Sequence, residues 1–175
     1  MRPGSFVFGA AVVLGLALPD AARAEGCFGP GTPLFHCTMN KGATALDLCL
    51  QGTVVIYRFG PSGGAADLLQ SHEATRVDMT PWPGVGRTIW EDTTLENEGF
   101  RYVVHRATDR MIAEDDPDYS AAARGGVEVS KDGRVVSDRE CDAGSVTVAD
   151  FYPLYEAKEA AGQCWNRDTF SWGAC

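Results

Sequence analysis

The 27-residue stretch from Leu34 to Gly60, LFHCTMNKGATALDLCLQGTVVIYRFG, constrains the fold more than any other part of the chain. Asn40-Lys41-Gly42 is typical of a turn, because Asn and Gly tolerate a positive φ. Leu34 to Thr38, before this turn, is short and mostly apolar. Leu46 to Leu50, after it, alternates leucine with Asp and Cys, which is the period of a β-strand. We therefore expect two short strands joined by a tight turn.

A third strand is predicted over Thr53 to Phe59, where five of seven residues are Val, Ile, Tyr or Phe. Both faces of this strand are apolar, which favours a central place in a sandwich or barrel. Gly60 to Gly64 ends the strand as a turn or an exposed loop. Three strands within so short a stretch predict an all-β domain.

Further strands are predicted towards Asp138. Arg87 to Leu95 alternates modestly and is expected to pair with Phe100 to Arg106. Val127 to Asp138 is predicted to be a hairpin with Asp132-Gly133, a favoured two-residue turn, at its tip. Ala65 to Leu69 is expected to be a fourth strand. The predicted fold class is all-β, an antiparallel barrel or sandwich of about seven or eight strands with a short C-terminal helix and disulfides.

Residues 1–24 are interpreted as a signal peptide, with Arg2 at a positive start and an apolar core from Phe6 to Leu18. Ala22-Arg23-Ala24 is a small-x-small cleavage site. The apolar core is too short to span a bilayer as a permanent helix. The mature chain is therefore expected to have no membrane span and to be periplasmic or secreted.

The remaining chain is predicted to have two parts. Residues 25–142 form the β-barrel or sandwich domain, and residues 143–175 form a C-terminal helical, disulfide-bounded appendage. The helix is expected over Pro153 to Ala161, because Pro suits a first helical turn and Gly162 suits the stop.

The chain has six cysteines: Cys27, Cys37, Cys49, Cys141, Cys164 and Cys175. An even number in an exported chain predicts three disulfides. No Cys-x-x-Cys occurs, which argues against a thioredoxin-like role or a zinc site. The pairing is left open by the sequence. A local Cys164–Cys175 ring is preferred, because it would hold a tail that otherwise frays, and the competing pairings tie one of these two to an earlier cysteine.

The pattern of a Phe-x-Cys strand, a Leu-x-Cys-Leu strand and a Tyr-Arg-Phe-Gly strand resembles a family of short, secreted, largely uncharacterised proteobacterial proteins. The resemblance extends to Trp82–Gly86, Phe100–Val104 and Gly125–Val129 before Cys141, and so covers roughly residues 34–141. These motifs are structural, and they imply a fold more than an activity.

More distantly, the size, compartment and strand pattern resemble the bacterial periplasmic lysozyme inhibitors, which are small antiparallel β-barrels. Those inhibitors typically carry a Ser-Gly-x-x-Tyr loop that enters the lysozyme cleft. Here Ser62, Gly63 and Gly64 are followed by two alanines, so the loop has the Ser-Gly but not the Tyr. The resemblance implies that Ser62, Gly63 and Gly64 contact a partner.

The chain has 15 basic and 24 acidic residues and a formal net charge of −9. Such a protein repels phosphates, which excludes non-specific binding of nucleic acid. It would attract a basic partner, although acidity that only keeps an exported protein soluble is the alternative. The acidic cluster of Asp115, Asp116 and Asp118 is interrupted by Pro117 and lacks the frame of a calcium loop. No cofactor or metal site is predicted.

No enzymatic pattern stands out. His36, His72 and His105 lie outside any Ser/His/Asp or Cys/His motif and are interpreted as ordinary strand or surface residues. A paired-carboxylate glycosidase site is the enzymatic alternative. Its candidates are Glu91, Asp92, Glu96 and Glu98.

Aromatic residues are the remaining candidates for a site. Trp82 lies in a Pro-rich loop, and Trp165, Phe170 and Trp172 lie in the C-terminal segment. Rigid aromatic side chains on a stapled loop make good binding anchors, and the alternative is that they pack over one end of the barrel. Among them, Trp165 and Trp172 are predicted to contact a partner.

The predicted function is that of a non-enzymatic exported binding protein. Its most specific version is a periplasmic lysozyme inhibitor, in which a loop occludes the cleft of a basic lysozyme. The alternatives are a structural or assembly module of the cell envelope and a small-ligand-binding barrel. A large apolar cavity would favour the last of these.

Overall fold

The computed structural model of the protein describes Cys27, residues 30–109 and residues 123–175. The interpreted signal peptide, residues 1–24, and the acidic cluster at Asp115, Asp116 and Asp118 lie outside the described residues. Within these ranges, the helices are too short or too polar to cross a bilayer.

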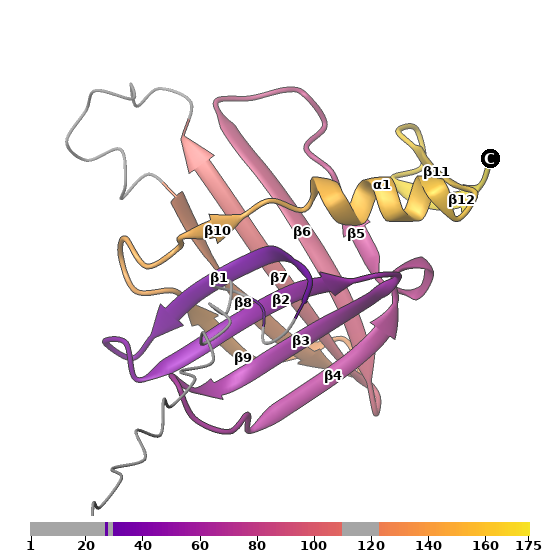
Figure 1. The fold of residues 1–175 in the computed structure, drawn as a ribbon. Coiled ribbons are helices and arrows are strands. Elements are labelled where there is room, and N and C mark those ends of the chain that lie inside the picture. The colour runs from indigo at the N-terminus through magenta and orange to yellow at the C-terminus, as the bar shows by residue number, and fades with distance from the viewer. Residues whose placement is uncertain (1–26, 28–29, 110–122) are drawn as a thin grey trace, which may run out of the picture.

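Two antiparallel five-stranded sheets form a sandwich (Figure 1). The first sheet has the strand order β10-β1-β2-β3-β4. Its strands are β1 (Thr32–Met39), β2 (Thr44–Gln51), β3 (Val54–Pro61), β4 (Leu68–Glu73) and β10 (Val148–Ala149). The three strands predicted around the central stretch are thus confirmed as β1, β2 and β3. Their first turn has the predicted geometry, since Asn40, Lys41 and Gly42 have φ values of 56°, 60° and 84°.

The second sheet has the strand order β5-β6-β7-β8-β9. Its strands are β5 (Asp78–Thr80), β6 (Thr88–Asn97), β7 (Phe100–Asp109), β8 (Ala123–Lys131) and β9 (Arg134–Glu140). The predicted β6–β7 and β8–β9 hairpins are confirmed. Asp132 and Gly133, at the tip of the second hairpin, both have positive φ, as this turn requires.

The predicted sandwich of seven or eight strands corresponds to the eight long strands, to which β5 and β10 add short edges. The fourth strand was placed wrongly at Ala65 to Leu69, since β4 begins at Leu68. Between β3 and β4 the chain folds back on the end of β3, where the Asp67 nitrogen donates to the Phe59 carbonyl. A side chain on Gly60 would place its Cβ 2.6 Å from the Asp67 nitrogen, so the loop closes over a position that only Gly fits.

The core lies between the two sheets, and alternate residues of β2, β3, β7 and β8 contribute to it. Phe35 of β1 is fully buried, and its ring lies against the backbone of β8 at Gly125. A Cβ on Gly125 would come within 2.8 Å of this ring. The sheets therefore approach closely there because β8 has no side chain at that position.

The first part of the C-terminal segment covers one side of the sandwich, and the rest extends away from it. The helix α1 (Tyr152–Ala160) follows β10, and Phe151 and Leu154 reach into the core. Gly162, with a φ of 82°, ends the helix as predicted. The strands β11 (Gln163–Asn166) and β12 (Ser171–Ala174) then form a hairpin at the far end of α1 (Figure 1).

All six cysteines are paired, as Cys27–Cys49, Cys37–Cys141 and Cys164–Cys175. The first two bonds hold β2 and β1 of the sandwich, and the third closes the C-terminal hairpin. The preferred local ring is therefore confirmed, and Cys27 finds its partner in the sandwich instead.

Candidate ligand-binding pocket

A pocket of about 390 Å3 lies where the C-terminal hairpin and α1 meet the segment after β5. We call it the aromatic pocket. Its lining residues come from four segments of the chain and are Met79, Pro81, Trp82, Pro83, Glu91, Tyr152, Tyr155, Trp165, Arg167 and Phe170. This volume falls in the usual range for small-molecule sites, about 300–1,000 Å3. A mostly aromatic wall with few polar groups is also typical of such sites.

Trp172 docks the hairpin onto the rest of the protein. Its Nε1 donates a hydrogen bond of 2.7 Å to the carbonyl of Met79. Its ring meets Tyr155 edge-on at 5.0 Å between centroids, and the Nζ of Lys158 lies 4.8 Å from its centroid. Trp172 is therefore packed, and the prediction that it is presented to a partner gains no support.

Trp165 is the residue that this docking presents to the pocket. It lies directly opposite Trp172 in the β11–β12 register, with 5.6 Å between the ring centroids. The Cys164–Cys175 bond holds the same two strands together. Because Trp172 packs against Trp165, the half-buried indole of Trp165 is already positioned before any ligand binds.

Two tyrosines of α1 form the second wall. Tyr152 and Tyr155 lie parallel, with 7° between their planes and 6.0 Å between their centroids. The Asp150 carboxylate accepts a hydrogen bond from the Tyr152 backbone nitrogen at 3.0 Å and so fixes the start of the helix. Tyr152 is 61% exposed, which leaves its ring open to a ligand.

Trp82 forms the third wall, in the loop between β5 and β6. Pro81 and Pro83 restrict the backbone on either side of it. Its Nε1 donates a hydrogen bond of 3.1 Å to the Val85 carbonyl within the same loop. The polar edge of the indole thus has a partner in the loop, while the ring lines the pocket.

Glu91 supplies the pocket with a carboxylate. Nε and Nη2 of Arg106 both donate to its Oε2, at 2.9 and 2.6 Å. The two side chains are only 15% and 18% exposed, so the pair is well shielded from water. Among the described residues, Oε1 of Glu91 has no hydrogen-bond donor, and this oxygen can accept one from a ligand.

Phe170 occupies a backbone position that turns usually give to Gly or Asn. Its φ is 49°, and left-handed backbone costs an L-residue about 1–2 kcal/mol. The turn itself is held by Asn166, whose Oδ1 accepts bonds from the nitrogens of Asp168 and Thr169. The Phe170 ring is 58% exposed and lines the pocket. The ring also meets Trp165 edge-on at 6.3 Å between centroids, and this contact offsets part of the backbone cost.

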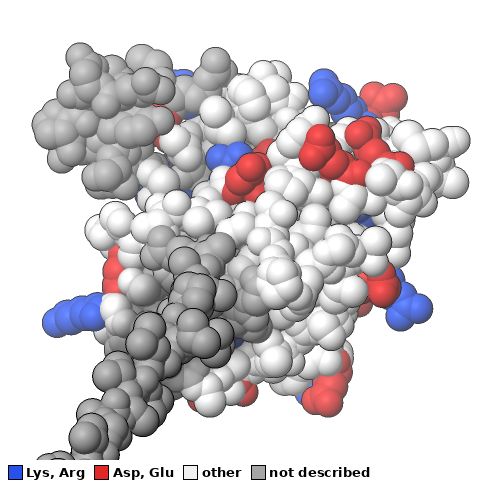
Figure 2. All heavy atoms as spheres, viewed as in Figure 1, with Lys and Arg blue, Asp and Glu red and all other residues white. Residues whose placement is uncertain are grey.

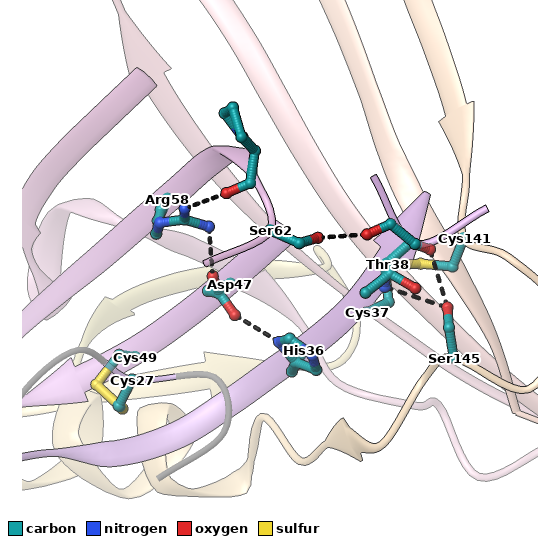
Figure 3. Close-up of polar contacts among 12 residues, drawn as sticks. Cys27, His36, Cys37, Thr38, Asp47, Cys49, Arg58, Ser62, Cys141 and Ser145 are labelled. Atoms are coloured by element: carbon teal, nitrogen blue, oxygen red, sulfur yellow. Dashed lines mark hydrogen bonds and ion pairs between the residues drawn. A yellow bond between two sulfur atoms is a disulfide. The ribbon is translucent and has the colours of Figure 1, made fainter. Parts of the chain in front are cut away.

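The loop of Ser62, Gly63 and Gly64 lies elsewhere, at the end of β3, and its polar groups are engaged in the protein (Figure 3). The Ser62 hydroxyl donates to the Gly42 carbonyl at 2.7 Å. Nη2 of Arg58 donates to the carbonyls of Pro61 and Gly64, at 2.7 and 2.8 Å. The loop is therefore held at the surface of the first sheet, with its exposed serine bonded to the neighbouring turn.

A buried ion cluster on the outer face of the first sheet supports this loop. His36, Asp47 and Arg58 are direct neighbours across β1, β2 and β3. Asp47 accepts from Arg58 at 3.2 Å and lies 2.5 Å from Nδ1 of His36 (Figure 3). Asp47 and Arg58 are only 7% and 8% exposed, so they stabilise each other where neither could be buried alone.

Two of the four glycosidase candidates, Glu91 and Asp92, do not face each other. Glu91 and Asp92 are consecutive in β6 and therefore lie on opposite faces of the sheet. Burial raises the pKa of Asp92, although a hydrogen bond from Thr80 and the charge of Arg101 oppose the shift. Asp92 thus belongs to the outer face, while Glu91 lines the pocket.

Three of the five aromatic residues of this pocket could be identified from the sequence. Trp82, Trp165 and Phe170 stood out as aromatic residues in loops or in the stapled tail, and the structure brings all three together. Tyr152 and Tyr155 were missed, although their spacing of three residues at the start of a predicted helix places them on one face. Arg167 was missed as well.

Comparison with protein-family models, curated proteins and solved structures finds no match. The resemblance to secreted proteobacterial proteins and to lysozyme inhibitors therefore stays a prediction.

Proposed function

We propose that this protein is an exported, non-enzymatic binding protein, periplasmic or secreted, whose ligand site is the aromatic pocket. Three disulfides are typical of proteins that fold in an oxidising compartment. The carboxylate in the pocket is neutralised by Arg106, which favours a role in holding a ligand over a role in acid–base chemistry.

The observation that carries this proposal is the assembly of the pocket from distant segments. Trp82, Tyr152 and Trp165 belong to a loop, a helix and a hairpin, and separate contacts fix each segment. Surface aromatic residues gathered in this way expose apolar area that a monomeric fold would otherwise cover. Their fixed orientation lowers the ordering cost of binding.

Lysozyme inhibition is a second candidate with narrower support. Figure 2 shows acidic side chains gathered over the region where Figure 1 places α1, and Glu156 and Glu159 of this helix are exposed. Such a face would steer a basic enzyme towards the protein. The loop at Ser62 offers less, because its hydroxyl is bonded to Gly42. An inhibitor of this kind would approach through α1 and the aromatic pocket.

The test is a ligand screen by NMR on the purified exported protein, with 15N labelling and a fragment set that includes sugars, amines, acyl chains and proline-rich peptides. We expect one class to shift the amides of residues 79–83 and 152–170. Trp165→Ala should abolish these shifts. Trp90→Ala, which removes an exposed tryptophan of β6 outside the pocket, should retain them.

Shifts confined to residues 60–66 would move the site to the Ser62 loop and contradict the proposal. A screen in which no class shifts the pocket would also contradict it. Addition of a lysozyme in the same experiment tests the second candidate, because an inhibitor would show shifts along α1.

A further inference from the structure

We infer that the ligand of the aromatic pocket is a saccharide, with the apolar face of a pyranose ring against the aromatic walls and a hydroxyl donating to Oε1 of Glu91. This inference rests on the proposed function and adds the chemical class of the ligand. Three features of the pocket carry it: its aromatic surfaces, its polar groups and its charge balance.

The aromatic surfaces suit a ring that is apolar on its faces and polar at its rim. A pyranose exposes C–H groups on its faces and hydroxyls around its edge. Trp82, Trp165 and Tyr152 line a pocket that is open to water on one side, so stacked C–H groups are buried while part of the rim stays hydrated. A long acyl chain would instead need a closed, aliphatic cavity.

The polar groups suit hydroxyls. Glu91 has one oxygen occupied by Arg106 and one that can accept, so it can receive a charge-assisted hydrogen bond from a neutral donor. Arg167 lines the same pocket and offers donors to a hydroxyl, an N-acetyl carbonyl or a uronate. A sugar hydroxyl both donates and accepts hydrogen bonds, so it can bond to the Glu91 carboxylate and to the Arg167 guanidinium.

The charge balance disfavours a cationic ligand. Aromatic cages bind quaternary ammonium groups through the electron-rich faces of the rings, assisted where an unpaired carboxylate is near. Here the charge of Glu91 is offset by Arg106, and Arg167 adds a positive charge to the lining. A neutral sugar meets no such repulsion.

Phe170 enlarges the aromatic wall next to Trp165. Its backbone is left-handed, and its ring is mostly exposed beside Trp165, at 6.3 Å between centroids. Gly would suit the backbone better, and only the ring is gained by having Phe there. The ring extends the surface that Trp165 offers to the sugar.

The experiment uses a glycan array that covers hexoses, N-acetylhexosamines, uronic acids and peptidoglycan fragments, followed by calorimetry with the strongest glycan. Tetramethylammonium and a proline decapeptide are titrated in parallel. We expect one glycan group to bind. Glu91→Gln should weaken this binding about tenfold or more, as expected for a hydrogen bond to a charged group.

Phe170→Gly is the second variant, and it keeps the test valid if Glu91→Gln fails to fold. It should weaken glycan binding at least several-fold while its melting temperature stays equal to that of the wild type or rises. Trp90→Ala is the matched control and should bind as the wild type does.

The possible failures are distinguishable. Binding of tetramethylammonium or the decapeptide in the pocket, with no glycan bound, would overturn the saccharide inference and leave the proposed function intact. Glycan binding that Phe170→Gly and Glu91→Gln both leave unchanged would place the sugar elsewhere and overturn the inference. The absence of any pocket ligand in both screens would end the inference together with the proposed function.

Discussion

The sandwich and the C-terminal hairpin are stabilised in different ways. Cys27, Cys37 and Cys49 of the sandwich are at most 5% exposed, and Cys37 belongs to a continuous apolar core. The hairpin of β11 and β12 has no fully buried residue. It depends on the Cys164–Cys175 bond, the docking of Trp172 and few other contacts.

This difference shows where the protein can change without losing its fold. Binding surfaces are commonly placed on the less stable parts of a structure, because such parts carry little of the core. The aromatic pocket follows this rule, since Trp165, Arg167 and Phe170 all come from the hairpin or its turn. Substitutions in each region test whether the two regions are energetically separate.

The largest effect is expected from the double substitution Cys37→Ala and Cys141→Ala. This bond closes a loop with a sequence separation of 104, and on the chain-entropy model a loop of that length contributes about 4–5 kcal/mol. Equilibrium unfolding in urea should show this loss of stability, together with a lower melting temperature. An unfolding free energy close to that of the wild type would mean that the core, not this bond, holds β1 to the end of β9.

A smaller and more local effect is expected from Cys164→Ser with Cys175→Ser. The ring has a sequence separation of 11, for which the same model gives about 3 kcal/mol at most. Because the hairpin can detach alone, we expect fast amide exchange over residues 163–175 and loss of ligand binding, with a much smaller change in the unfolding of the sandwich.

The wild type offers a second test of the same separation. Both cysteines of the hairpin are exposed, and exposed disulfides are the easier ones to reduce. Under mild reduction followed by alkylation, Cys164 and Cys175 should be labelled first. Simultaneous labelling of Cys37 would show that the hairpin and the sandwich open together.

Lys158 of α1 contacts both regions, since its Nζ bonds to the segment between β4 and β5 and lies 4.8 Å from the centroid of Trp172 in the hairpin. Its side chain is almost fully buried, and its Nζ donates to the carbonyls of Ala74 and Val77 at 3.2 and 2.6 Å. Burial lowers the pKa of this amine, and the charge of Asp78 opposes that shift. The carbonyls belong to or follow the short 3-10 helix that links β4 to β5.

Lys158→Met should destabilise the protein by about 1–3 kcal/mol, because it leaves two carbonyls without this donor. Thermal unfolding measures the change, and Glu159→Gln, an exposed substitution on the same helix, is the control. If Lys158→Met unfolds like the control, desolvation of the amine offsets its hydrogen bonds.

Much of the sandwich could be predicted because its hairpins are local. Asn40 to Gly42 and Asp132-Gly133 mark turns by backbone chemistry alone, and the strands on either side need no distant information. The pairing of β10 with β1 could not be predicted, since Val148–Ala149 is too short to show a period. Its partner lies more than a hundred residues earlier.

The pocket was only partly predictable for the same reason. Aromatic residues in loops can be identified from sequence, but their gathering depends on where a whole helix and hairpin dock. Trp165 and Trp172 look alike in the sequence, yet one lines the pocket and the other donates its indole N–H to Met79. The loop at Ser62 shows the same limit, because a sequence motif says nothing of the Arg58 and Gly42 contacts that hold it.

The smallest effect at neutral pH is expected from a substitution in the middle of the sandwich, Tyr57→Phe. The Tyr57 side chain is 1% exposed, and its ring packs on Tyr102 at 5.6 Å between centroids. Phe keeps this packing, so the stability at pH 7 should change by no more than about 1 kcal/mol. The difference between the two proteins should appear in alkaline solution.

Burial raises the pKa of Tyr57 above its ordinary value, and Tyr102 raises it further while Arg139 opposes the shift. The unfolded chain loses this proton near pH 10, where the folded protein still keeps it. The contribution of Tyr57 to stability is therefore fully present below pH 10 and is lost above it, by about 1.4 kcal/mol per pH unit. Phe does not ionise, so urea unfolding from pH 7 to about pH 11 should show a shallower alkaline loss in the variant. If the unfolding free energy of both proteins falls equally steeply with pH, Tyr57 becomes accessible to water before the sandwich unfolds. The core would then open locally more easily than its burial indicates.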